Sequence, residues 1–312
     1  MAINHRRQLT DEERAERRQR DREYARQAIE RLRSSEGWRT WLTTRATFHG
    51  YSLGNQLLIA MQRPTATRVA GFKAWLKLGY CVRRGETAIR IWAPCPPSRK
   101  QLERWQQNGA DPDQRPRTFF KLAAVFADDQ VTPLPPPAMP APLDPPIRDV
   151  DGDELASVIP SLVELAEEIG CTVMFAPVSS GAHGYYEPSS DRIVVEAGLS
   201  ANQRVNTLCH ELAHALVRHD RQADDPALDY AGEELVAESV AYTCVGALGV
   251  STKDYSIPYL AAWAESSDLA VLERTAGLID RLARRIEDAA IPDQGSGDET
   301  DTAIADQQAV TA

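Results

Sequence analysis

The pentapeptide HELAH, residues 210–214, decides how the rest of this 312-residue chain is interpreted. On a helix, His210 and His214 are four residues apart and share one face, so their imidazoles can chelate one zinc ion. Glu211 then lies beside the metal, where it can act as general base towards a zinc-bound water. Because HELAH-like pentapeptides arise by chance in roughly one chain in a hundred of this length, the surrounding sequence has to support the site.

The residues around HELAH predict a helix that begins about ten residues before it. Ser200 can cap the N-terminal amides, and Gln203 can reach back to complete a capping box. Apolar residues then recur at helical spacing and predict a buried stripe with the two histidines at its edge. His219 falls near the end of the same helix, where we expect it to cap carbonyl groups rather than to bind zinc.

A third ligand is needed because catalytic zinc typically has three protein ligands and keeps a fourth position for water. A later helical stretch offers Glu233, Glu234 and Glu238. Glu234 and Glu238 are one turn apart and face the same way, so one can bind metal while the other accepts a hydrogen bond from a ligating imidazole. We predict Glu234 as the ligand and Glu238 as the hydrogen-bond partner, with exchange of roles left open. We interpret Glu233 as a solvated glutamate.

The charge of the chain is divided unevenly. The net charge is −10, yet residues 1–130 contain 25 Lys and Arg against 14 Asp and Glu, while the remainder contains 10 against 31. Five of the six tryptophans also lie in this basic half. Basic residues interleaved with aromatic ones are typical of a nucleic-acid surface, and a solvated basic face over a Trp-rich core is the alternative.

Composition divides the chain into four segments. Residues 131–148 contain eight prolines and predict an extended linker between two α+β domains, residues 1–130 and 149–290. Residues 291–312 are polar and acidic, which predicts a disordered tail. The sequence shows no apolar run of membrane-spanning length, no signal peptide and no CxxC pair among five cysteines. We therefore expect a reduced, cytoplasmic protein without a membrane partner.

Hydrophobic periodicity and turn residues predict the elements of each half. In the first half we expect helices at 10–33, 52–61, 72–78 and 102–107, and strands at 67–70, 88–92 and 118–126. In the second half we expect a helix at 153–169 that Pro160 kinks or divides, a strand at 171–178, a hairpin turning at 188–191, and helices around HELAH, at 234–242 and at 268–290.

HELAH followed by ExxAE at 234–238 resembles the gluzincin metallopeptidases. The stretch GYYEPSSDRIVV, residues 184–195, is similar to the hairpin that precedes the metal helix in the ImmA/IrrE group. The resemblance covers roughly residues 149–250 and implies a zincin-like domain with a small antiparallel sheet beside the HExxH helix. It also implies that an edge strand, either Ile193–Val195 or the strand of Tyr185, aligns a peptide substrate by β-addition.

In gluzincins the first glutamate of the second motif is the third metal ligand. The resemblance therefore implies Zn²⁺ held by His210, His214 and Glu234, with Glu211 as the catalytic residue.

The segment Phe48–Cys95, which begins FHGYSLGNQ, resembles the N-terminal single-stranded-DNA-binding domain of ArdC-type antirestriction proteins and of related plasmid primases. In ArdC-type proteins a zinc metallopeptidase-like domain follows, so the two resemblances imply one architecture. Single-stranded DNA needs cations along its phosphates and exposed rings on which bases stack. On this basis we expect DNA-binding residues at Arg45, Tyr51, Asn55, Arg68, Lys73, Trp75, Arg83 and Arg84.

The preferred hypothesis is a DNA-associated zinc metallopeptidase-like protein of the ArdC type. In it, Glu211 takes a proton from zinc-activated water and returns it to the leaving amine. A second hypothesis is a non-catalytic DNA-binding antirestriction factor with a structural zinc site. A third is a peptidase that cleaves one specific regulator and uses the N-terminal domain for localisation. The expected partners are single-stranded DNA and an unidentified protein substrate.

Overall fold

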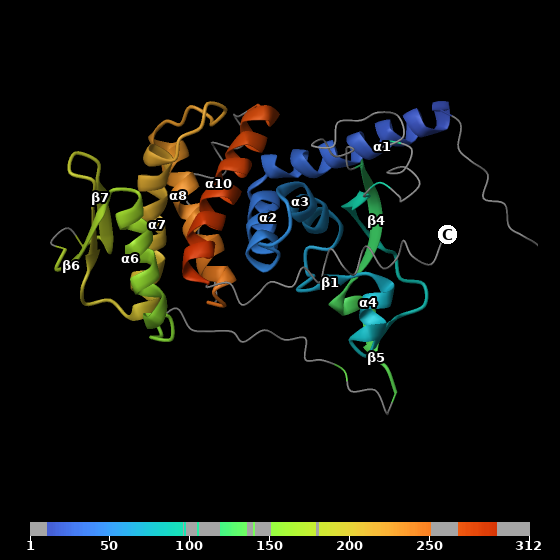
Figure 1. The fold of residues 1–312 in the computed structure, drawn as a ribbon, viewed down its shortest axis with the longest axis horizontal. Coiled ribbons are helices and arrows are strands. Elements are labelled where there is room, and N and C mark those ends of the chain that lie inside the picture. The colour runs from blue at the N-terminus through green and yellow to red at the C-terminus, as the bar shows by residue number, and fades with distance from the viewer. Residues whose placement is uncertain are drawn as a thin grey trace, which may run out of the picture.

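The computed structural model describes residues 11–95, 97, 105, 119–135, 140, 151–178, 181–250 and 268–291. The predicted helix at 102–107, apart from Trp105, and most of the predicted linker and tail lie outside these ranges. The strands of the two halves lie towards opposite ends of the molecule, with helices α2 (Ser35–Thr47) and α10 (Leu269–Ala290) between them (Figure 1). None of the helices described is long and apolar enough to cross a membrane.

The N-terminal half begins with helices. Those predicted at 10–33 and 52–61 are present, and α2 lies between them, capped by Ser34, whose Oγ accepts a hydrogen bond from the Gly37 N–H at 3.0 Å. Trp38 and Trp41 of α2 are fully buried and pack edge to face, with ring centroids 5.3 Å apart. These two tryptophans therefore belong to the core. The other bounds are α1 Asp11–Glu30, the 3₁₀ turn η1 Arg31–Arg33, and α3 Leu53–Gln62.

Two small antiparallel sheets complete this half, with strand orders β1-β4-β3 and β2-β5. In β3, Ile89 and Ile91 are buried while Arg90 is exposed, as their alternation predicts. The first residues of the predicted linker, from Val131, form β5, because they extend the ladder of β2. The bounds are β1 Val69–Ala70, α4 Phe72–Lys77, β2 Tyr80–Val82, β3 Ile89–Cys95, β4 Phe119–Ala127, η2 Asp128–Gln130 and β5 Val131–Pro133.

The small sheet expected in the C-terminal half is present with strand order β6-β8-β7, but it is mixed rather than wholly antiparallel. The predicted hairpin is present as the antiparallel pair β7 and β8, and β6 joins β8 in parallel. The helix predicted at 153–169 is divided near Pro160, which lies in the first turn of α6 after a separate 3₁₀ turn. The bounds are η3 Ala156–Val158, α6 Ile159–Glu168, β6 Thr172–Ala176, β7 Gly184–Glu187 and β8 Arg192–Glu196.

The HELAH motif lies on α7 (Ala201–His219), which packs against α8 (Tyr230–Ala247). The predicted capping box is confirmed: Ser200 Oγ accepts from the Gln203 N–H, and Gln203 Oε1 accepts from the Ser200 N–H, both at 3.3 Å. Helix α8 is capped by Asp229, whose Oδ1 accepts from the Gly232 N–H at 2.9 Å.

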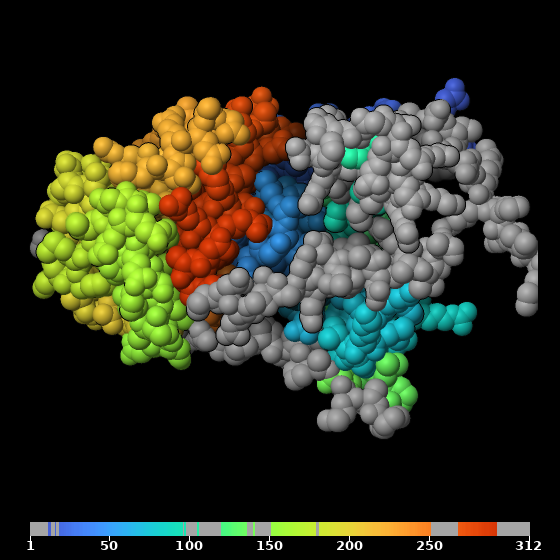
Figure 2. Space-filling model, in the orientation of Figure 1, coloured from blue at the N-terminus to red at the C-terminus, as the bar shows by residue number. Residues whose placement is uncertain are grey.

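The two halves share one hydrophobic core. Helix α2 packs on α8, and one cluster of buried side chains extends from the N-terminal helices to α10. The Trp38 indole donates to Ser239 Oγ at 3.4 Å, and the hydroxyls of Thr43 and Tyr242 lie 2.9 Å apart. On the face shown in Figure 2, α10 lies between α6 and the N-terminal helices. The two halves, which differ in composition on either side of residues 131–148, therefore pack together around one continuous interior.

Candidate functional site

Helices α7 and α8 bring the three predicted metal ligands together. The Nε2 atoms of His210 and His214 lie 3.2 Å apart. Glu234 Oε2 lies 3.8 Å from His210 Nε2, and Glu234 Oε1 lies 3.7 Å from His214 Nε2. Two imidazole nitrogens and a carboxylate oxygen within 4.8 Å of one another form a donor set that fits one divalent metal ion.

Each histidine has a further carboxylate beside its other ring nitrogen. Glu238 Oε1 is 4.0 Å from His210 Nδ1, and Glu233 Oε1 is 3.3 Å from His214 Nδ1. At 3.3 Å the Glu233 carboxylate can accept a hydrogen bond from His214 Nδ1, as carboxylates that orient a ligating imidazole do, whereas 4.0 Å is beyond hydrogen-bond distance for Glu238. The interpretation of Glu233 as a purely solvated residue was therefore wrong. Its contact depends on the direction in which α8 crosses α7, which spacing along one helix does not contain.

Glu211 is buried beside these ligands, with 7% of its surface exposed. Burial raises the pKa of Glu211 to about 7, and the carboxylates of Glu234 and Glu238 add to the rise. A hydrogen bond from the backbone N–H of Tyr186 acts in the opposite direction. A carboxyl group that titrates near neutrality can both accept a proton and return it.

Burial also controls the charge of the neighbouring groups. It lowers the pKa of His210 to about 4, and the nearby His214 acts in the same direction. Burial and then the charge of Glu234 raise the pKa of Glu238. His210 is consequently neutral around pH 7, and the neutral imidazole is the form that binds metals.

A cavity of about 430 Å³ opens beside His210 and Glu211. His183, just before β7, contributes to its wall, although the metal motifs do not point to this residue. Its position just before the predicted hairpin indicates that it could approach a substrate, although an ordinary loop histidine is the simpler interpretation of that position. The remaining lining residues are Gly181, Gly184, Asn206, Thr207, Glu238 and Ala241.

Strand β7 is the edge strand that packs on α7. A Cβ at Gly184 would lie 2.6 Å from both Thr207 Cγ2 and the Val194 carbonyl oxygen, so glycine permits this close approach. The alternative aligning strand, Ile193–Val195, is wrong, because it lies buried in the middle of the sheet. Among the described strands, β7 pairs only with β8, and its Tyr185 is 43% exposed.

Arg45, a predicted DNA-binding residue, is fully buried. Its guanidinium donates to Asp280 Oδ1 at 3.1 Å and to the carboxylate of Glu287. The prediction was wrong for Arg45, because its charge is neutralised inside the protein and faces no solvent.

Asn55 and Trp75 are also buried rather than available to DNA. The Asn55 amide accepts from the Trp92 backbone N–H at 2.7 Å and donates to the Trp92 carbonyl at 2.9 Å. The Trp75 indole donates to the Phe126 carbonyl at 2.8 Å. Both predictions were wrong because each side chain satisfies the backbone of a neighbouring strand.

The other predicted DNA-binding residues reach the surface. Arg83 and Arg84 are exposed in the turn after β2, where Arg83 pairs with Glu86 at 2.6 Å. Neither side chain is fixed in the interior, so both remain candidates for phosphate contacts. The half-buried members of the set are Tyr51, Arg68 and Lys73.

Comparisons by sequence and by structure find several similar proteins. An uncharacterized protein of Bacillus anthracis, pXO2-81, is 25% identical over 250 residues, which cover 71% of this chain and 42% of that protein. The chain therefore spans less than half the length of this relative.

Two solved structures are also similar, both of the antirestriction protein ArdC from plasmid R388. The Mn(II)-bound structure has 20% identity and a TM-score of 0.46, and the match covers 77% of this chain and 85% of that one. The metal-free structure has the same identity and TM-score, with coverages of 76% and 84%.

Two family models match separate parts of the chain. Residues 10–126 match the N-terminal domain of anti-restriction factor ArdC, and residues 164–277 match a zincin-like metallopeptidase. The first match ends before the proline-rich segment, and the second contains both metal motifs. The chain thus carries an ArdC-type N-terminal domain followed by a zincin-like metallopeptidase domain.

Proposed function

We propose that this protein is a zinc-dependent peptidase whose N-terminal domain brings it to single-stranded DNA or to proteins bound there. The observation that carries the proposal is the convergence of His210, His214 and Glu234, with the buried Glu211 beside them at the edge of a cavity. The match to a zincin-like metallopeptidase supports zinc as the ion. The two imidazoles and one carboxylate also suit Zn²⁺, which accepts nitrogen and oxygen donors.

The chemistry then depends on this chain's own residues. When bound, the ion would lower the pKa of a water molecule and polarise the peptide carbonyl. Glu211 would accept the proton of the attacking water and return it to the leaving amine, for which its pKa of about 7 is suited. Glu233 and Glu238 would keep the Nδ1 atoms of His214 and His210 protonated, which leaves each Nε2 free to bind.

The substrate would lie along β7. An extended peptide can pair with the edge of this strand through backbone hydrogen bonds and so be aligned beside the cavity. The exposed ring of Tyr185 would then contact a side chain of the peptide. Because the substrate would have to bind as an extended strand, the peptidase should cleave only protein segments that are unstructured or locally unfolded.

The Glu211→Gln variant tests catalysis. An unfolded model protein such as denatured casein would be incubated with zinc-loaded protein, with and without a single-stranded oligonucleotide. We expect the variant to lose about 100-fold or more in cleavage rate while its zinc content stays unchanged, because general acid–base catalysis contributes at least this factor. Glu167→Gln, on the exposed side of α6, is the matched control and should cleave like the wild type. Equal cleavage, or none, by wild type and Glu211→Gln under every condition would refute the peptidase.

The DNA-binding role is tested in the full-length chain. Affinity for single-stranded DNA should fall with salt, and the Arg83→Ala/Arg84→Ala variant should reduce the slope by about 0.7 for each phosphate that it no longer neutralises. Arg39→Ala, an exposed arginine on α2, is the control and should leave the slope unchanged. Affinity that is independent of salt, or absent at low ionic strength, would contradict DNA binding by this half.

A second candidate function is favoured by the match to the ArdC N-terminal domain: a DNA-binding antirestriction factor that shields DNA without cleaving protein. In that case Glu211→Gln should protect DNA from a restriction endonuclease as well as the wild type does. Loss of protection in a variant that retains its fold and zinc would instead tie protection to catalysis.

A further inference from the structure

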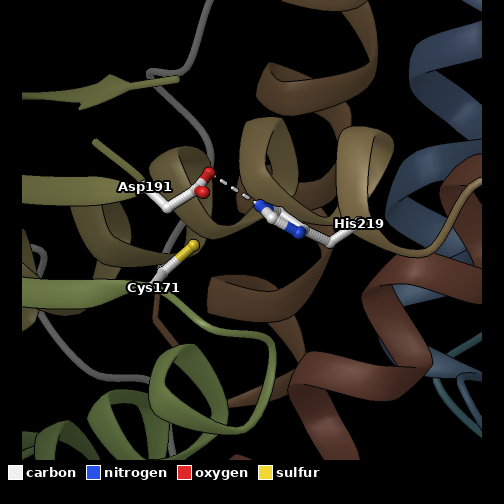
Figure 3. A group of neighbouring side chains, drawn as sticks. All are labelled: Cys171, Asp191 and His219. Carbon is white, nitrogen blue, oxygen red and sulfur yellow. Dashed lines mark hydrogen bonds and ion pairs between the residues drawn. The ribbon is translucent and has the colours of Figure 1, made fainter. Parts of the chain in front are cut away.

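A second group of potential metal ligands lies at the other end of the HELAH helix. Cys171 immediately precedes β6, Asp191 lies in the turn between β7 and β8, and His219 is the last residue of α7. Figure 3 shows the three side chains pointing toward one another, with Cys171 and Asp191 on the sheet side and His219 on the helix. One ligand atom from each lies within 4.8 Å of the others.

This group is separate from the site of His210 and His214. His219 follows His214 by five residues, which places it roughly 7.5 Å further along the helix axis. None of its three members lines the cavity beside Glu211. The group is therefore unused by the proposed peptidase chemistry.

Hydrogen bonds hold two of the three donors, Asp191 and His219, close together. His219 Nε2 lies 2.9 Å from Asp191 Oδ1, and the Tyr186 hydroxyl donates to the same oxygen at 2.8 Å. The Tyr186 hydroxyl is also 3.2 Å from His219 Nε2. The backbone of Asp191 has a φ of 46°, an uncommon left-handed conformation for a non-glycine residue.

The group of three side chains is open to solvent on one side, from which an ion could reach it. The Asp191 and His219 side chains retain 37% and 26% of their accessible surface, whereas Cys171 is 1% exposed and lies beneath them. The hydrogen bonds of Asp191 with His219 and Tyr186 join the hairpin turn to α7. They do not account for the thiol of Cys171 at the same place. Thiolate sulfur, imidazole nitrogen and carboxylate oxygen are each donors that zinc accepts in proteins.

We propose that Cys171, Asp191 and His219 form a second metal site, with Zn²⁺ as the ion and water or the Tyr186 hydroxyl as fourth ligand. On binding, the Cys171 thiol releases its proton to solvent and coordinates as thiolate. The three ligands come from the start of β6, the hairpin turn and the end of α7. The ion therefore fastens the sheet, including β7, to the helix that carries HELAH.

Cobalt gives a direct test, because only a thiolate ligand produces a sulfur-to-cobalt charge-transfer absorption in the near ultraviolet. Metal-free full-length protein would be titrated with Co²⁺. We expect the band in the wild type and in the His214→Ala/Glu234→Ala variant, which disrupts the first site. We expect its loss in Cys171→Ser. Cys81→Ser, at a half-exposed cysteine of the N-terminal half, is the control and should keep the band.

Zinc content provides the second measurement. Cys171→Ser and His219→Gln should each bind one zinc ion fewer per chain than the wild type, whatever the occupancy of the first site. The substitution of the buried Cys171 could disturb folding, so Asp191→Asn is a second test of the site. Asparagine tolerates the same backbone conformation as Asp191, and this variant should bind zinc more weakly than the wild type. Absence of the charge-transfer band in the wild type, or equal zinc content in folded wild type, Cys171→Ser and His219→Gln, would overturn the second site.

Discussion

Arg45 and Glu287 form a buried ion pair although 242 residues separate them in the sequence. Arg45 lies on α2 of the N-terminal half, and Glu287 lies near the end of α10. The same guanidinium contacts Asp280, whose Oδ1 also accepts from the Gln56 amide at 3.1 Å. A closed polar network therefore joins the two halves within their common interior.

Breaking this network from one side should be costly. Arg45→Met leaves the carboxylates of Asp280 and Glu287 buried without their cation, so we expect a loss of about 3–5 kcal/mol in the free energy of unfolding. Urea denaturation of the full chain measures this loss. The exposed pair of Arg63 and Asp129, 2.8 Å apart, gives a control: Arg63→Ala should cost less than about 1 kcal/mol. Equal effects of the two substitutions would contradict the buried network.

The shared core predicts that the C-terminal half does not fold by itself. Residues 149–312 lack α2, which covers α8, and would expose the apolar surface that Trp38 and Trp41 bury in the full chain. We expect this fragment to bind a hydrophobic dye and to unfold without a cooperative transition. In the full chain, Trp38→Ala should cost about 3–5 kcal/mol, because the cavity it leaves lies inside the core. A cooperatively folded fragment would show that the two halves are independent.

The carboxylates beside the histidines predict a graded effect on metal affinity. Glu233→Gln and Glu238→Gln should each weaken zinc binding by about 10- to 100-fold, because the imidazoles lose the partners that orient them. Competition with a chromogenic chelator measures the affinity. We expect the larger loss for Glu233→Gln, whose carboxylate is 3.3 Å from its histidine, against 4.0 Å for Glu238. Unchanged zinc affinity in both variants would show that Glu233 and Glu238 do not contribute to metal binding.

The lowered pKa of Asp128 predicts that the free energy of unfolding depends on pH. Although burial alone would raise its pKa, hydrogen bonds from the Thr67 hydroxyl and from the backbone N–H groups of Thr67 and Arg68 lower it overall. The folded pKa is thus below the unfolded value of about 3.9. Asp128 therefore stabilises the fold above that pH, and the stabilisation disappears as the pH falls through the folded pKa.

The Asp128→Asn variant should consequently lose about 2 kcal/mol at neutral pH, since a neutral amide with one acceptor oxygen replaces the charged carboxylate that accepts these hydrogen bonds. Urea denaturation at a series of pH values should show the difference from the wild type shrinking towards acid. Asp288→Asn, at an exposed position of α10, serves as control and should show a smaller effect. A difference that stays constant from neutral to acid pH would exclude the proposed role of the Asp128 charge.

The local elements could be predicted because their signals are contained in neighbouring residues. The capping box at Ser200 and Gln203 fixed the start of α7, and the spacing of His210 and His214 placed both on one face. The spacing of Glu234 and Glu238 predicted that both face the same way, and the resemblance to gluzincins favoured Glu234 as the ligand, whose carboxylate lies close to both imidazoles. These features depend on helix geometry, which is the same in every protein.

The remaining features depend on how elements pack, which the sequence does not display. The charge of Arg45 predicted a surface residue, yet α10 supplies buried carboxylates that neutralise it. Glu233 had no local signal, because its histidine lies on another helix. His219 was expected to cap its own helix, and instead its ring contacts Asp191, which the hairpin turn brings to it. Each of these outcomes depends on contacts between segments distant in the chain.

Helix α8 bears Glu234, the proposed third metal ligand, and also contacts α2 through Ser239 and Tyr242. It is therefore the element through which the two ends of the molecule could influence each other. If DNA binding shifts α2 and changes the affinity for metal by some factor, metal binding must change the affinity for DNA by the same factor, because thermodynamic coupling is reciprocal. Comparing DNA affinity in the metal-free and metal-loaded protein would give that coupling free energy without any knowledge of the peptide substrate.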